Sequence, residues 1–69
     1  MMLKSITTDF YSIRMDVHTD DSRGELWVSV KVHENNKLYN TENFPGNKYK
    51  DALEYFNRRE SELKAAYGK

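Results

Sequence analysis

Two successive stretches of this 69-residue chain alternate strictly between apolar and polar side chains, and this alternation limits the fold more than any other feature. The apolar members of the first stretch are Tyr11, Ile13, Met15 and Val17, and those of the second are Leu26, Val28, Val30 and Val32. A period of two residues is typical of a β-strand that buries one of its faces. The pattern therefore predicts two strands, over residues 11–18 and 25–33.

Turn-forming residues separate the predicted strands. Residues 19–24 are polar and end in glycine, which is typical of a hairpin loop. Asn35 and Asn36 form the predicted turn of the next hairpin, because asparagine tolerates a positive φ. A third strand is expected over residues 37–44 and a short edge strand over residues 3–8. Together these segments predict an antiparallel meander of three to four strands.

The alternation also predicts how the strands pair. The expected cross-strand pairs are Val17–Leu26, Met15–Val28, Ile13–Val30, Val32–Tyr39 and Val30–Thr41. This register gathers the apolar side chains on one face of the sheet. A slip by one residue would divide them between both faces, so the hydrophobic pattern selects against it.

The hydrophobic period changes after Pro45 and Gly46. From there an apolar stripe with a period of 3.6 predicts a helix over about residues 47–67, with Asn47 as N-cap and Gly68 as C-terminal cap. The expected fold class is α+β, with a sheet over about residues 3–44 and one C-terminal helix packed on one face. The whole chain, residues 1–69, would form a single domain.

Composition excludes several classes of protein. Cysteine is absent, which excludes a disulfide scaffold and a cysteine-ligated metal site and suits a cytoplasmic protein. No run approaches the ~18–20 apolar residues of a membrane span, and no signal peptide opens the chain. The 11 basic and 11 acidic side chains cancel, which disfavours binding to nucleic acid through a general basic field.

The second face of the predicted sheet is the candidate functional surface. One helix covers one face, so the other face meets solvent or a partner. By the predicted register it displays Phe10, Ser12, Arg14, Asp16, Trp27, Ser29, Lys31, His33, Leu38, Asn40, Glu42 and Phe44. Trp27 would lie centrally, flanked by Asp16 and Phe44. Tryptophan and arginine are enriched at the energetic centres of protein interfaces. The predicted partner-binding residues are Arg14, Asp16, Trp27, Ser29, Lys31 and Phe44.

The same residue types leave other interpretations open. The face could be solvated and bind nothing. It could also bind single-stranded RNA, because RNA-binding sheets stack bases on aromatic side chains and Phe10, Trp27 and Phe44 would be available. Asp16 and Glu42 on the same face disfavour that ligand.

The two histidines do not predict a catalytic or metal site. The expected register puts His33 near Phe10 and His18 near Glu25, at opposite ends of the sheet. A zinc site needs about three converging ligands, and no serine is placed beside a histidine as a nucleophile–base pair. We therefore expect a protein that is not an enzyme and has no cofactor and no metal.

The order of the elements resembles that of small anti-CRISPR proteins carried by phages and mobile elements. The resemblance runs from Leu3 to Tyr67: a short first strand is followed by FYSIRMDV (10–17), by LWVSVKV (26–32), by residues 38–44 and then by the helix. It implies an inhibitor that binds another protein, a Cas protein or complex, through exposed sheet residues.

The chain is also similar to HicB-like antitoxins, whose strands lead through a Pro-Gly turn into a helix. Here Phe44-Pro45-Gly46 precedes the helical segment Lys50-Asp51-Ala52-Leu53. The alternative to the inhibitor is therefore a homodimeric structural or antitoxin-like module, in contact through the sheet face or an edge strand.

Overall fold

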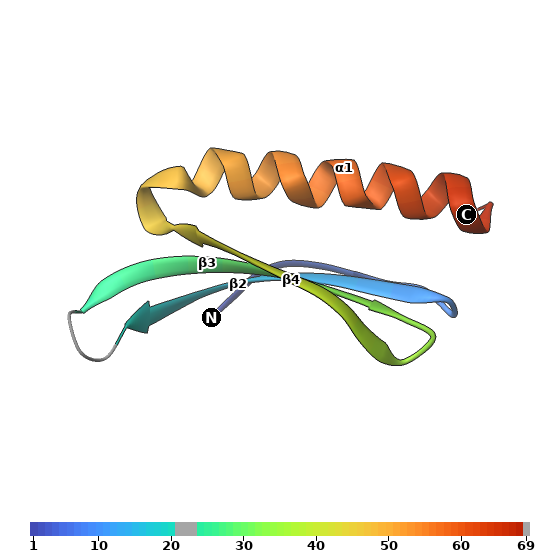
Figure 1. Ribbon diagram of the computed structural model, residues 1–69, viewed down its shortest axis with the longest axis horizontal. Helices are drawn as coiled ribbons and strands as arrows, with labels where there is room; N and C mark the ends of the chain where they lie inside the picture. The colour runs from blue at the N-terminus through green and yellow to red at the C-terminus, as the bar shows by residue number, and fades with distance from the viewer. Residues whose placement is uncertain (21–23, 69) are drawn as a thin grey trace.

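The computed structural model describes residues 1–20 and 24–68, which form an antiparallel sheet and one helix. The elements are β1 (Met2–Thr7), β2 (Tyr11–Asp20), β3 (Glu25–Glu34), β4 (Lys37–Pro45), the 3-10 turn η1 (Gly46–Lys48) and α1 (Tyr49–Tyr67). The four strands follow one another in the order β1-β2-β3-β4, and α1 lies along one face of the sheet (Figure 1). The predicted fold class, an α+β meander with a C-terminal helix, is confirmed.

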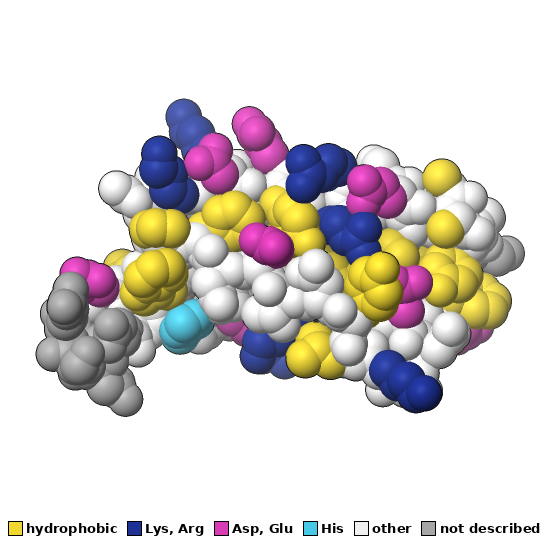
Figure 2. All heavy atoms as spheres, viewed as in Figure 1, with side chains coloured by type: hydrophobic (Ala, Val, Ile, Leu, Met, Phe, Trp, Pro, Cys, Tyr) yellow, Lys and Arg dark blue, Asp and Glu magenta, His cyan; other side chains and the backbone are white. Residues whose placement is uncertain are grey.

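The alternating apolar residues face the helix, as predicted. The core consists of Tyr11, Ile13, Met15, Val28, Val30, Val32, Ala52, Phe56 and Leu63, all at most 4% exposed. Hydrophobic side chains form a band between helix and sheet, while charged side chains lie along the outer side of the helix (Figure 2). The exception is Leu26, which is 58% exposed at the end of the sheet, against Gly46.

The first hairpin has the predicted faces but a different register. Ile13 lies opposite Val32, Met15 opposite Val30 and Val17 opposite Val28, two residues away from the expected pairs. The strands run farther than predicted, to the pair Asp20–Glu25, and part of the predicted loop 19–24 lies outside the described residues. A shift of two residues equals the period of the strand, so every side chain keeps its face and the apolar pattern could not detect the difference.

The second hairpin contains a β-bulge that the sequence did not predict. Asn35 and Asn36 have φ of 52° and 66°, as the predicted two-residue turn requires. The expected register holds for the two pairs beside the turn. Thereafter Val32 lies opposite Asn40 rather than Tyr39, and Val30 opposite Glu42 rather than Thr41. Tyr39 is thus an extra residue on β4, and every residue after it changes face.

Four residues that were predicted on the face opposite α1 lie elsewhere in the structure. Three of them are displaced by the bulge, and one lies just before the start of β2. Beyond the bulge, Asn40, Glu42 and Phe44 lie on the helix side of the sheet, because they pair with core residues of β3. Phe44 packs against Tyr55 of α1, with ring centroids 5.9 Å apart. Phe10 also leaves the predicted face, because it stacks on Tyr67 of α1 with ring centroids 5.6 Å apart.

The helix begins differently from the prediction and ends as expected. Asn47 lies inside η1, and the N-cap is Lys48, which makes no capping bond through its side chain. The predicted cap at Asn47 is therefore wrong. At the other end Gly68 has a φ of 71° and its N–H donates to the Lys64 carbonyl at 2.8 Å, which confirms the predicted C-terminal cap.

Candidate functional site

The face of the sheet opposite α1 is the candidate site, and no described element covers it (Figure 1). Its side chains form four rows across the strands: Ser5–Arg14–Lys31–Thr41, Met2–Asp16–Ser29–Asn43, Thr7–Ser12–His33–Leu38 and His18–Trp27–Pro45. We call this surface the open face. It is polar in its centre, while its larger apolar side chains, those of Met2, Trp27, Leu38 and Pro45, lie toward its edges.

The structure brings five of the six predicted binding residues together on the open face. These are Arg14, Asp16, Trp27, Ser29 and Lys31. The sixth, Phe44, lies on the other side of the sheet because of the bulge at Tyr39. Sequence reasoning missed Thr41, Asn43 and Pro45, which take the places on β4 that the prediction gave to Asn40, Glu42 and Phe44.

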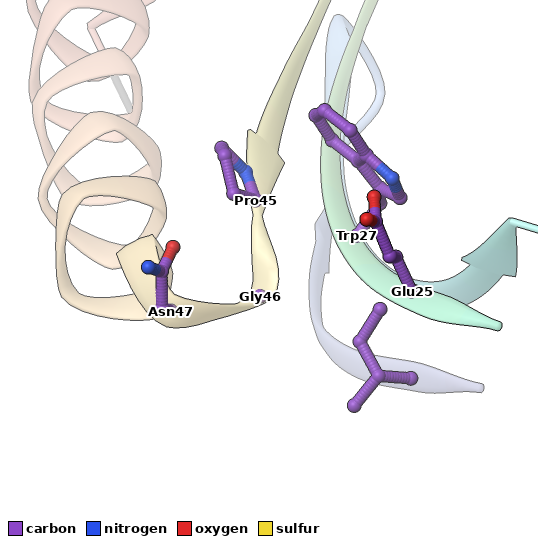
Figure 3. Close-up of a pocket in the computed structure, with 6 residues that line it drawn as sticks. Glu25, Trp27, Pro45, Gly46 and Asn47 are labelled. Atoms are coloured by element: carbon purple, nitrogen blue, oxygen red, sulfur yellow. The ribbon is translucent and has the colours of Figure 1, made fainter. Parts of the chain in front are cut away.

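Trp27 lies at one end of the open face rather than at its centre. It is half-buried, and its neighbours across the sheet are His18 and Pro45 instead of Asp16 and Phe44. Its indole projects from β3 beside the Glu25 side chain, facing Pro45 on β4 (Figure 3). An open hollow of about 440 Å³ adjoins it and continues around the end of the sheet to Leu26 and Gly46.

Basic residues dominate the centre of the open face. A second hollow, of about 600 Å³, is lined by side chains that include Arg14, Asp16, His18, Ser29, Lys31 and His33. Arg14 Nε donates to the Asp16 carboxylate at 2.9 Å, and Lys31 lies directly across from Arg14 on β3. Lys31 is exposed and makes no ion pair with any described residue.

A chain of hydrogen bonds crosses three strands beneath this hollow. Ser29 Oγ donates to Asn43 Oδ1 at 2.6 Å, and His18 Nε2 lies 2.7 Å from the same Ser29 oxygen. Sequence reasoning did not pair a serine with a histidine, because its register put His18 near Glu25. The observed register puts His18 opposite Trp27, diagonal to Ser29.

The hydrogen-bond chain links β2, β3 and β4 through the Ser29 side chain. The Ser29 hydroxyl donates to an amide oxygen, which is not a base, and His18 Nε2 donates to Ser29 in the tautomer that carries its proton on this nitrogen. Ser29 is also only 4% exposed, which keeps its oxygen away from a substrate. Within residues 1–20 and 24–68, no three histidine, aspartate or glutamate side chains lie close enough to hold a metal ion.

The perturbed titrating groups lie on the helix side. Burial raises the pKa of Tyr55, whose hydroxyl donates to Asn40 Oδ1 at 3.2 Å. The hydrogen bond from the Tyr67 hydroxyl to Glu34, 2.7 Å long, raises the pKa of Tyr67. Both tyrosines fix α1 to the sheet, so these shifts are structural features and not features of the open face.

Comparison with known proteins finds no match for this chain among family models, curated proteins or solved structures. Among the described residues, no helix has the length and apolar character that crossing a membrane requires.

Proposed function

We propose that this protein is a small non-enzymatic protein-binding module whose open face occupies a surface of a larger protein. The observation that carries the proposal is the open face itself: the described part of the chain covers the four-stranded sheet on one side only, and the other side carries a half-buried tryptophan beside a hollow. Tryptophan is a frequent hot-spot residue in interfaces, and a hollow at its side gives a partner side chain a place to enter.

The mechanism that this arrangement supports is steric. Trp27 would fill a pocket of the partner while Arg14 and Lys31 set the register of the complex. A chain this small blocks a functional surface without needing a cleft of its own. The order of the elements, four strands and then a helix, supports an inhibitor resembling the anti-CRISPR proteins of phages, with a Cas protein or complex as partner. The sequence contains no cysteine, which suits action in the reducing cytoplasm.

The homodimeric, antitoxin-like alternative finds less support in the edges of the sheet. The register shifts between Met2 and Lys4 in β1 and between Val32 and His33 at β4, so both edge strands are bulged. Lys4 also points to the helix side, with its Nζ 4.7 Å from the centre of the Phe56 ring. Bulges and inward-pointing charges are devices by which proteins prevent pairing at sheet edges.

The single-stranded RNA alternative depends on three aromatic side chains, and two of them do not lie on the open face. Phe10 and Phe44 pack against α1, which leaves Trp27 as the only one of the predicted aromatic trio on the open face. Glu42, one of the two acids predicted on this face, also lies on the helix side of the sheet.

The proposal predicts that Trp27→Ala weakens partner binding by about 2 kcal/mol or more while the fold persists. The tagged protein and the variant are used side by side to capture partners from a bacterial lysate, followed by mass spectrometry and titration of the captured protein. Tyr49→Ala is the matched control, because Tyr49 is an exposed aromatic residue on the helix (44% exposed) and its loss should leave binding unchanged.

Circular dichroism separates a binding defect from a folding defect. A partner that is retained by both variants, or lost equally with both, would contradict the proposal. Capture of RNA alone, removed by salt, would replace it with the RNA alternative.

A further inference from the structure

We propose that the partner presents an acidic segment, and that the centre of the open face around Arg14 and Lys31 binds it. This inference rests on the proposed function and adds the chemistry of the partner. It is carried by the arrangement of charge on the open face.

The first observation is a pair of like charges in direct opposition. Arg14 on β2 and Lys31 on β3 are cross-strand partners on the same face of the sheet. Like charges in this position destabilise a sheet, so the fold itself gives no reason for the pair. A carboxylate held between the two cations would remove the repulsion. Local departures of this kind from what stability favours are typical of functional positions.

The second observation is that this pair keeps unused donors. Asp16 accepts from Arg14 Nε, and no described residue bonds the other guanidinium N–H groups. The Arg14 side chain is 58% exposed. Arginine has five N–H donors in a fork that suits carboxylates, and lysine has three donors on its ammonium group. Both side chains are therefore available to an acidic group that arrives from solvent.

The third observation is the balance of charge around the central hollow, on a chain whose formal net charge is zero. The bulge at Tyr39 turns Glu42 to the helix side, and Asp16 is the only acid among the residues that line the central hollow. Two histidines, His18 and His33, line the same hollow. Complementary potential then favours a negatively charged partner and disfavours a basic one.

The composition of the face favours an acidic polypeptide over nucleic acid. Proteins that bind single strands combine basic residues with several exposed aromatic platforms. Around Arg14 and Lys31 the rows contain small polar side chains instead, those of Ser5, Ser12 and Thr41. Hydroxyl groups of this kind can bond the backbone and carboxylates of a peptide but offer no surface for stacked bases.

The test uses two short fluorescein-labelled peptides, one of alternating glutamate and serine and one with glutamine in place of every glutamate. Fluorescence anisotropy is measured at an ionic strength of about 0.15 M. We expect the acidic peptide to bind the wild type at least about tenfold more tightly than its neutral counterpart. Lys31→Gln should weaken the acidic peptide by about fivefold or more. The matched control, Lys50→Gln, removes the same charge from the exposed surface of α1 and should leave binding within about twofold.

Thermal unfolding keeps the result independent of folding. Lys31→Gln should melt at the same temperature as the wild type or higher, because it removes the repulsion from Arg14. Weaker binding by a variant that is no less stable is a signature that a purely structural role of Lys31 would not produce.

Four results would overturn the inference. Equal affinity for the two peptides would exclude recognition of carboxylates, and an equal loss with Lys50→Gln would show binding to overall charge. Tighter, Lys31-dependent binding of an oligouridylate would assign the face to nucleic acid. If the acidic peptide fails to bind while a captured protein still depends on Trp27, the proposed function holds and the acidic chemistry is wrong. If the peptide binds through Lys31 but no protein is captured in a Trp27-dependent way, the proposed function fails instead.

Discussion

Gly46 shows at the scale of one residue how the end of the sheet is joined to the helix. A Cβ atom added there would lie 3.0 Å from both the Cβ atom and the carbonyl oxygen of Leu26. The close approach lets η1 turn back over β3 within three residues. The neighbouring Asn47, which has the residue type of a helix cap, makes no capping hydrogen bond through its side chain.

Replacement of these two neighbours by alanine should therefore have different effects on the free energy of unfolding. Gly46→Ala is expected to lower the free energy of unfolding by about 1 kcal/mol or more, because Leu26 and its backbone must move. Asn47→Ala should change it by less than about 0.5 kcal/mol, whereas loss of a true N-cap costs typically ~1 kcal/mol. Urea denaturation of both variants measures the two effects. The reverse order would mean that Asn47 caps the helix in solution.

Strand β4 shows at the scale of an element how one residue decides which side chains form the site. Tyr39 adds a residue between Leu38 and Asn40, and this turns Phe44 onto Tyr55 and places Asn43 within reach of Ser29. Tyr39 itself is 67% exposed, so its position in the chain matters more than its side chain. Apolar and polar residues alternate only weakly over residues 37–44, so the sequence does not reveal the bulge. For this reason the prediction placed Phe44 on the wrong face of the sheet.

Deletion of Tyr39 should be far more damaging than its replacement. Without the extra residue β4 must either turn Asn40, Glu42 and Phe44 to the open face or lose its pairing with β3. We expect a loss of about 2 kcal/mol or more in the free energy of unfolding, since a partly buried aromatic side chain leaves the core. Tyr39→Ala, the control of unchanged length, should cost less than about 1 kcal/mol. Similar costs for both variants would contradict the assigned bulge.

The whole molecule consists of two layers, the sheet and the helix, and measures 41 × 22 × 16 Å. The helix side is closed by the core and by the bonds of Tyr55 and Tyr67, while the open side ends in polar groups. A two-fold dimer whose axis passes through the centre of the open face would bring the Arg14–Lys31 pair of one copy toward that of the other, because such an interface is isologous. Repulsion between these cations opposes that dimer.

The protein should consequently be a monomer at micromolar concentration. Sedimentation velocity should give a single species of about the mass of one chain, 8.2 kDa. The melting temperature should not change with protein concentration, because only a dimer is stabilised by mass action. A melting temperature that rises with concentration, and more steeply for Lys31→Gln than for the wild type, would favour the homodimeric alternative.

Local sequence patterns were enough to predict the faces of β2 and β3, the Asn35–Asn36 turn and the helix with its Gly68 cap. Each depends on a local rule: alternation places Ile13 and Val30 on the same side, and a positive φ or a left-handed cap selects asparagine or glycine. These signals need no knowledge of distant residues. They were sufficient for the fold class and for the side of the sheet on which five of the six proposed binding residues lie.

Three features could not be predicted from local sequence patterns and became visible in the folded structure. These are the register of the first hairpin, the bulge at Tyr39 and the pairing of Arg14 with Lys31. A shift by two residues leaves the hydrophobic pattern unchanged, so the sequence cannot distinguish it. The bulge places Phe44 on the helix side of the sheet, where its ring packs against that of Tyr55. This contact joins residues of two different elements, so the local pattern of β4 does not reveal it. The charge of the open face depends on both, because the register and the bulge together determine which acids and bases share it.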